Sequence, residues 1–205
     1  MNIERTAIIV LDPQNDFFTP NGKLFEAMEP VLSKYQVVKN INTLLEAGRK
    51  GGAKIILAPL SFAEGCPEAG PAPYGIMQAV SQAKAFIRGS WGADISELLT
   101  VNARDLTIPK NHISAFENTS LEAQLRKDNI ENVVLCGGLT DVCVETTMRQ
   151  AYDKRFNVFT IQDATATIDL EKHEQTVSQN FELFSKPLLT REFIQMINPN
   201  DSKAA

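Results

Sequence analysis

The sequence predicts an α/β fold in which helices cover both faces of a parallel β-sheet. One observation is that four short runs are continuously apolar, as strands covered on both faces must be: residues 6–11, 54–59, 132–137 and 157–162. The other is that helical patterns lie between these runs, so strand and helix alternate along the chain. The segment "DLTIPK", residues 105–110, is a weaker fifth strand.

The helical segments are predicted from their apolar stripes and their ends. Residues 31–52 place Val, Ile and Leu on one face and end at Gly51-Gly52. Residues 119–128 open with a capping box of Thr119 and Glu122. Two further helices are expected from the sequence, at residues 141–155 and 171–184, and the last eight residues are expected to fray.

Composition limits the class of protein. A chain of 205 residues suits one domain spanning 1–205, and 43% hydrophobic residues is ordinary for a folded protein. The net charge of -5 gives no broad basic surface, so neither nucleic acid nor an anionic membrane is an expected partner. The N-terminus enters a strand without a signal-peptide pattern, and a cytoplasmic location is expected. Three cysteines without CxxC spacing predict neither a disulfide framework nor a zinc site.

An unusual segment follows the second strand. Residues 61–75, "SFAEGCPEAGPAPYG", are rich in Pro, Gly and Ala and are too long for a simple connection from strand to helix. The segment is either an inserted surface loop or a wall of a substrate pocket. Its composition favours a neutral or weakly polar substrate body in the second case.

Three reactive side chains converge at one edge of the predicted sheet. Ligands of open parallel sheets bind beyond the carboxyl ends of the strands. Asp12 follows the first strand, Lys110 ends the weak strand, and Cys143 follows the glycine turn after the third apolar run. Taken singly, Asp12 is a turn residue, Lys110 a surface residue and Cys143 a core residue as readily as a nucleophile. Their shared position favours a catalytic site.

The sequence separates two of the cysteines. Cys136 lies inside a strand and is expected to be an inert, buried thiol. Cys143 lies near a predicted helix N-terminus, capped by Thr140 or Asp141, where the helix dipole favours a thiolate. The Gly-Gly pair before it lets backbone N–H groups point at a developing oxyanion.

Four motifs closely resemble the isochorismatase-like cysteine hydrolases: "IIVLDPQNDFF", "RGSWGADISELL", "PKNHISAFENTSLEAQLR" and "VVLCGGLTDVCVETTMRQAYDKRFNVFTIQDATAT". The resemblance spans residues 6–193 in matching order. It implies a three-layer α/β/α fold with a six-stranded parallel sheet and a catalytic triad of Asp12, Lys110 and Cys143. It also implies a cis peptide bond between Gly138 and Leu139, with an oxyanion hole formed by the backbone N–H groups of Leu139 and Cys143.

The resemblance implies hydrolysis of a small amide or carbamoyl C–N bond through a thioacyl-enzyme, without a cofactor. Nicotinamidases of the family carry a metal-binding Asp/His cluster after the second strand, but "LAPLSFAEG" here has neither residue, so no metal is expected. Isochorismatases instead cleave a vinyl ether without needing a cysteine, and this alternative stays open. So does a non-catalytic binding protein on the same fold.

Several further residues have roles that the sequence leaves open. Phe17 and Trp91, with Gly138, are expected to line the substrate pocket. Arg88 either meets a substrate carboxylate or lies in solvent, and His112 either approaches the site or forms local hydrogen bonds. By the same resemblance, the chain is expected to form a homodimer or a homotetramer.

Overall fold

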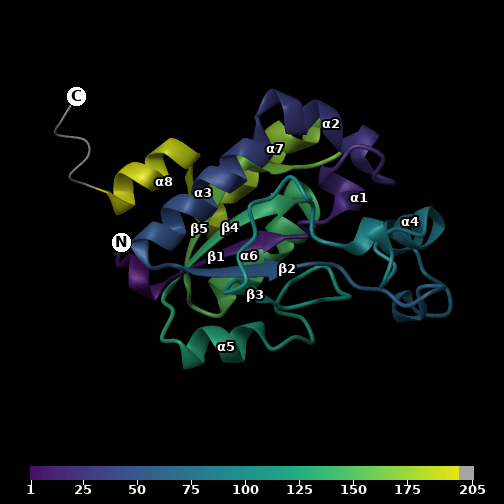
Figure 1. Cartoon of the computed structure of the whole chain (residues 1–205), viewed down its shortest axis with the longest axis horizontal. Helices are drawn as coiled ribbons and strands as arrows, with labels where there is room; N and C mark the ends of the chain where they lie inside the picture. The colour runs from purple at the N-terminus through teal and green to yellow at the C-terminus, as the bar shows by residue number, and fades with distance from the viewer. Residues whose placement is uncertain (199–205) are drawn as a thin grey trace.

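A computed structural model describes residues 1–198. It contains one six-stranded, all-parallel sheet with the strand order β3-β2-β1-β4-β5-β6 (Figure 1). The strands are β1 (Thr6–Leu11), β2 (Lys54–Ala58), β3 (Leu106–Thr107), β4 (Asn132–Gly138), β5 (Asn157–Ala166) and β6 (Lys186–Leu188). The predicted parallel sheet is therefore confirmed.

Eight α-helices flank the sheet in the described part of the chain. They are α1 (Asn15–Phe18), α2 (Phe25–Lys34), α3 (Val37–Gly51), α4 (Gly75–Ala83), α5 (Leu121–Lys127), α6 (Glu145–Asp153), α7 (Leu170–Phe184) and α8 (Thr190–Ile197). No helix within residues 1–198 is both long enough and apolar enough to cross a membrane.

The two faces of the sheet bury separate apolar layers. Along β1, Ile8 and Val10 belong to the core under α3 and α8, whereas Ile9 and its neighbours belong to the core over α5 and α6. Figure 1 shows α3 and α8 on one side of the sheet and α5 on the other. Each fully buried aliphatic side chain contributes roughly 1.5–3 kcal/mol. The result is the three-layer α/β/α arrangement that the sequence predicted.

Several predicted elements differ in detail. The helix expected over 31–52 is two helices, α2 and α3, because Gln36 adopts φ 51 and interrupts the helical path. The capping box at Thr119 is wrong. Helix α5 begins at Leu121, Thr119 Oγ1 donates to the Ala115 carbonyl, and the Glu122 carboxylate pairs with Lys154 Nζ at 2.5 Å.

The segment after β2 is more ordered than a plain loop. A 3₁₀ turn spans Pro67–Ala69, and α4 begins at Gly75. The fifth predicted strand shortens to β3, with Ile108 and Lys110 continuing alongside β2 through backbone bonds to Leu57 and Pro59. Of the tail that was expected to fray, residues 199–205 lie outside the described residues.

Candidate active site

Asp12 is fixed at the carboxyl edge of the sheet by the central strands. It is the first residue beyond β1, and its backbone N–H donates to the Ala58 carbonyl at 3.1 Å. Its φ of 50° lies in the left-handed region, which Asp tolerates better than most residues. The side chain is fully buried. Asp12 is therefore a buried carboxyl group at a position that the backbone defines tightly.

Lys110 reaches the same point from the edge of the sheet. Its N–H donates to the Pro59 carbonyl at 2.9 Å, and its carbonyl accepts from the Ser61 N–H at 2.8 Å. Its Nζ lies 2.7 Å from Asp12 Oδ1 and also donates to the His112 carbonyl at 3.1 Å. The ammonium group is thus held between a carboxylate and a backbone carbonyl.

Cys143 lies in a π-helical turn, Thr140–Val144, that leads into α6. Its Sγ is 3.6 Å from Lys110 Nζ. The predicted caps have other partners, because Thr140 Oγ1 hydrogen-bonds His173 Nδ1 at 2.9 Å and Asp141 Oδ1 accepts from Thr167 Oγ1 at 2.5 Å. Asp12, Lys110 and Cys143, separated widely in the sequence, therefore meet at one point.

Glycine is required in the turn that carries the cysteine. Gly137 has φ 109, and a Cβ there would lie 2.1 Å from the Leu11 carbonyl oxygen. The peptide bond between Gly138 and Leu139 is cis. The Leu139 carbonyl accepts from the N–H groups of Val142 and Val144, whereas its own N–H finds no acceptor within residues 1–198. The family resemblance implies that this donor forms one half of an oxyanion hole.

Burial controls the charges of the three groups. It raises the pKa of the Asp12 carboxyl above its ordinary value, although Lys110 and Cys143 oppose this. Burial lowers the pKa of Lys110, but Asp12 and Cys143 together outweigh it, so the pKa is raised and the ammonium persists. Burial, reinforced by Asp12, raises the pKa of the Cys143 thiol. Burial therefore favours a neutral Cys143 thiol at rest, and Asp12 and Cys143 together favour the Lys110 ammonium.

This charge state corrects the expectation that the helix dipole favours a Cys143 thiolate. The thiol sits in a π turn before α6, and desolvation by burial is the largest influence on its pKa. Neither Asp12 oxygen accepts a well-angled hydrogen bond from residues 1–198, despite the close ion pair with Lys110. Asp12 is thus a buried carboxyl group with a raised pKa, next to the Lys110 ammonium.

A cavity of about 110 Å³ opens onto Asp12 and Cys143. Every other lining residue is aliphatic, aromatic or methionine. One wall comes from Phe62 and from α4, through Ile76, Met77, Ala79 and Val80. Of the segment 61–75, Phe62 alone lines the cavity, and the helix that follows supplies the rest of this wall.

The structure divides the predicted pocket residues. Phe17 lines the cavity. The prediction for Trp91 is wrong, because its side chain is 45% exposed and does not line the cavity. Gly138 is also absent from the lining, since it packs behind Phe17, whose Cδ2 would lie 3.7 Å from an added Cβ. Sequence reasoning missed Ile113 and Ile168, which line the cavity from connections that carry no periodic pattern.

Arg88 and His112, whose roles the sequence left open, lie outside the cavity. Arg88 is exposed, donates from Nε to Ser61 Oγ at 3.1 Å and approaches Glu68 at 3.6 Å. The His112 side chain is also exposed, while its carbonyl helps to hold Lys110. Neither side chain is placed to meet a ligand beside Cys143.

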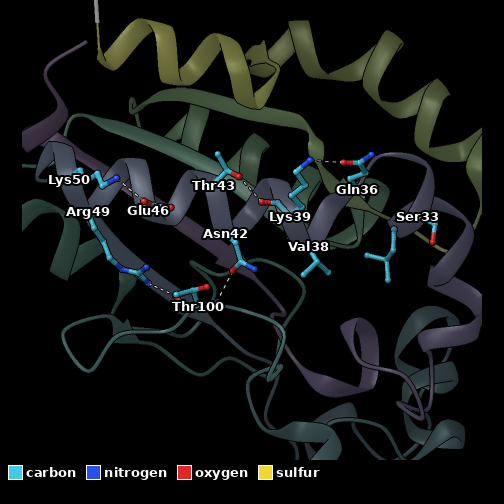
Figure 2. Close-up of a pocket in the computed structure, with 11 residues that line it drawn as sticks. Ser33, Gln36, Val38, Lys39, Asn42, Thr43, Glu46, Arg49, Lys50 and Thr100 are labelled. Carbon is cyan, nitrogen blue, oxygen red and sulfur yellow. Dashed lines mark hydrogen bonds and ion pairs between the residues drawn. The ribbon is translucent and has the colours of Figure 1, made fainter. Parts of the chain in front are cut away.

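A larger hollow of about 830 Å³ lies on the exposed face of α3. Figure 2 shows its polar side chains pairing with one another: Lys50 with Glu46, Arg49 with the Thr100 carbonyl, and Lys39 with Gln36. The residues that line it include no cysteine or histidine. Despite its size, this hollow offers no reactive group.

The described residues do not fit a metal site. Within residues 1–198 no group of three or more His, Cys, Asp or Glu side chains could hold a metal ion. After β2, where the sequence predicted no metal ligands, the cavity is lined by Leu60 and Phe62.

Comparison with known proteins gives consistent matches. A cysteine hydrolase from Pseudomonas syringae pv. phaseolicola is 26% identical, with a TM-score of 0.82 over 97% of this chain and 95% of that one. A nicotinamidase from Bacillus subtilis is 28% identical, with a TM-score of 0.73 over 90% and 98%. A pyrazinamidase from Pyrococcus horikoshii, solved with zinc, is 24% identical and shares the fold, with a TM-score of 0.71 over 90% and 99%.

The family assignment follows from the length of the matched region. The family model for the isochorismatase domain matches residues 6–192, from the first residue of β1 into α8. That region contains Asp12, Lys110 and Cys143, together with every strand of the sheet. The chain belongs to the isochorismatase family of hydrolases.

Proposed function

We propose that this protein is a cysteine-dependent hydrolase that cleaves a small amide or carbamoyl C–N bond through a thioacyl-enzyme. The observation that carries the proposal is the contact of Asp12, Lys110 and Cys143 at the base of an apolar cavity. A carboxylate base, a cation and a thiol in contact are the parts that nucleophilic acyl transfer needs. A vinyl-ether hydrolase would have no use for the thiol.

The first half-reaction begins with the neutral thiol. Asp12 takes the proton from Cys143, and the Lys110 ammonium favours the thiolate that forms. The sulfur attacks the substrate carbonyl carbon, and backbone N–H groups of Leu139 and Cys143 hold the oxyanion. When the C–N bond breaks, Asp12 returns the proton to the departing nitrogen, which leaves as ammonia or an amine.

The second half-reaction releases the acyl group. Asp12, ionised again, removes a proton from a water molecule that attacks the thioester carbonyl. The tetrahedral intermediate collapses, the C–S bond breaks, and the proton passes to Cys143. One water is consumed, and the carboxylic acid and the free thiol are formed. The chain needs no cofactor for any of these steps, and its partners are the small-molecule substrate and further copies of the chain, without nucleic acid or membrane.

The test compares two cysteine variants over a panel of small amides. Cys143→Ala should abolish ammonia release, because it removes the nucleophile. Cys136→Ala is the matched control, because that buried thiol, whose pKa burial raises to about 12, lies within β4 and does not line the cavity. Intact-mass measurement after rapid acid quenching should show the acyl adduct on the wild-type protein and on Cys136→Ala, and no adduct on Cys143→Ala.

Two outcomes would contradict the proposal. One is ammonia release that survives in Cys143→Ala. The other is the absence of turnover on every amide while isochorismate is hydrolysed, which would favour the ether hydrolase. Addition of a chelator to the wild-type protein or to Cys136→Ala should leave the rate of ammonia release unchanged. Activity lost to the chelator and restored by zinc would show a metal-dependent reaction instead.

A further inference from the structure

We infer that the site accepts short, uncharged aliphatic amides, with an acyl chain of about three to five carbons, in preference to aromatic amides and amides that carry a carboxylate. The inference rests on the proposed function and extends it to the substrate class. The size of the cavity, its rigid walls and the positions of the nearby charges all point to it.

The cavity is small for a ring. An apolar cavity of about 150 Å³ accommodates one benzene molecule, which has six heavy atoms. On that scale the cavity of about 110 Å³ beside Cys143 accommodates about four or five heavy atoms of the substrate. Butyramide and isobutyramide fit this space, whereas an amide with a six-membered ring exceeds it.

Part of the wall that sets this size belongs to the packed core, whereas Ile76 and Ile168, which also line the cavity, are 38% and 50% exposed. Phe17 is buried and contacts Phe86 with ring centroids 4.8 Å apart, and Phe62 is fully buried. Opening the cavity would require moving these rings together, and close-packed interiors resist such changes. Met77 and Val80 of α4 complete the wall with flexible or branched aliphatic groups.

The charges near the cavity disfavour a second anion. The Lys110 ammonium is already paired with Asp12 at 2.7 Å, and Arg88 is turned to Glu68 outside the cavity. A substrate carboxylate held inside the cavity would lie among apolar side chains, close to Asp12 and without a cation of its own. Burial of an unpaired charge is strongly unfavourable.

The lining also lacks groups that would bind a heteroaromatic ring. Apart from Asp12 and Cys143, no lining residue has a polar side chain. A pyridine nitrogen placed in this cavity would lose its hydrogen bond to water and gain none. Aliphatic chains carry no such penalty, because they have no polar atom to satisfy.

The first experiment measures kcat/KM for acetamide, butyramide, isobutyramide, nicotinamide and succinamate. Butyramide or isobutyramide should exceed nicotinamide and succinamate by at least about tenfold, since pocket complementarity commonly yields differences of this size. Acetamide should be slower than butyramide because it leaves the cavity partly empty. A higher kcat/KM for nicotinamide or succinamate would overturn the inference and leave the proposed function standing.

A designed variant tests the charge argument directly. Ile168 lines the cavity and is 50% exposed, so an arginine can be placed there without burying its charge. Ile168→Arg should raise the ratio of succinamate to butyramide turnover by about tenfold. The matched control is Leu183→Arg, which adds the same charge at a 61% exposed position of α7 that does not line the cavity. Equal ratios in both variants would contradict the charge argument.

Binding separates the failure of this inference from the failure of the proposed function. Calorimetry with Cys143→Ala should show butyramide binding more tightly than nicotinamide and succinamate. If that order holds while the wild-type protein hydrolyses none of the amides, the proposed reaction fails and the ligand class stands. If nicotinamide or succinamate binds more tightly, the ligand class is wrong whatever the reaction.

Discussion

Asp12 experiences two opposing influences. Full burial disfavours its charged form, and the Lys110 ammonium at 2.7 Å favours it. Burial is the larger effect, so the pKa of Asp12 lies above its ordinary value of 3.8. A carboxylate with a raised pKa is a stronger base and suits proton removal from a neutral thiol.

This shift predicts the acid limb of the pH profile. The reaction requires ionised Asp12, so kcat/KM should fall as the pH decreases through the raised pKa of Asp12, at a higher pH than an ordinary Asp would give. Asp12→Asn should lower kcat by about 10²- to 10⁴-fold and remove that limb.

Asp163→Asn is the control for the pH profile. The Asp163 carboxylate accepts from the N–H and Oγ1 of Thr190, both at 2.8 Å, and therefore has a structural partner. The acid limb should persist in this variant. An acid limb that stays in Asp12→Asn as well would show that another group acts as the base.

The sequence located the reactive residues better than their charge states. Asp12, Lys110 and Cys143 could be predicted to share an edge because the ends of parallel strands define that edge. The neutral state of the Cys143 thiol could not, because it depends on burial by Ile113, Leu139 and α4, which no local pattern brings together. The wrong prediction for Trp91 has the same reason, because its position in a motif does not determine which way its side chain faces.

At the scale of elements, α7 supports the turn that carries Cys143. His173 of α7 is almost fully buried, hydrogen-bonds Thr140 Oγ1 through Nδ1, and contacts the Tyr35 ring at 4.6 Å. Burial lowers the pKa of His173 to about 4. The unfolded chain, with an ordinary histidine pKa of about 6.5, therefore binds a proton at a pH where the folded protein does not.

This difference predicts how stability depends on pH. Stability from neutral His173 is complete above about pH 6.5 and is lost as the pH falls towards about 4. His173→Gln, which does not titrate there, should lower stability at neutral pH by roughly 1–3 kcal/mol and reduce the dependence on pH in this window. Denaturant unfolding at a series of pH values measures both effects. An identical pH dependence in the variant would exclude His173 as its source.

The wall formed after β2 gives a second prediction at this scale. Removal of residues 64–72 should displace α4 and with it Met77 and Val80, because the segment connects Phe62 to that helix. KM for butyramide should rise by about tenfold or more. The value of kcat should change less than KM, because the contacts of Asp12, Lys110 and Cys143 do not involve the removed residues. Unchanged kinetics would show that the segment is only surface.

Local patterns predicted the central elements and missed those fixed by tertiary contacts. Strands β1, β2, β4 and β5 are long apolar runs and could be located within a few residues. The break between α2 and α3 could not, because Gln36 takes a left-handed conformation that glutamine seldom adopts. Helix α4 was hidden because it follows a Pro- and Gly-rich segment that indicates a loop.

At the scale of the molecule, the expected homo-oligomer remains a prediction. Tyr74 is 87% exposed beside the half-exposed Ile76 at the start of α4, and such apolar groups are candidates for an interface. Light scattering after size-exclusion chromatography should give the mass of a dimer or tetramer. Tyr74→Glu should weaken the assembly, whereas Tyr152→Glu, 46% exposed on α6, is the control. A monomer at micromolar concentration would contradict the prediction.

The neutral state of Cys143 has a consequence for how long the enzyme survives. Hydrogen peroxide oxidises thiolates to sulfenic acid and then further, and it attacks thiols far more slowly. The thiol of the resting protein is protonated and nearly buried, so it presents little of the reactive form to an oxidant. The thiolate exists only for the brief interval after Asp12 takes its proton. Oxidative inactivation should therefore accumulate with the number of turnovers rather than with time in an aerobic solution.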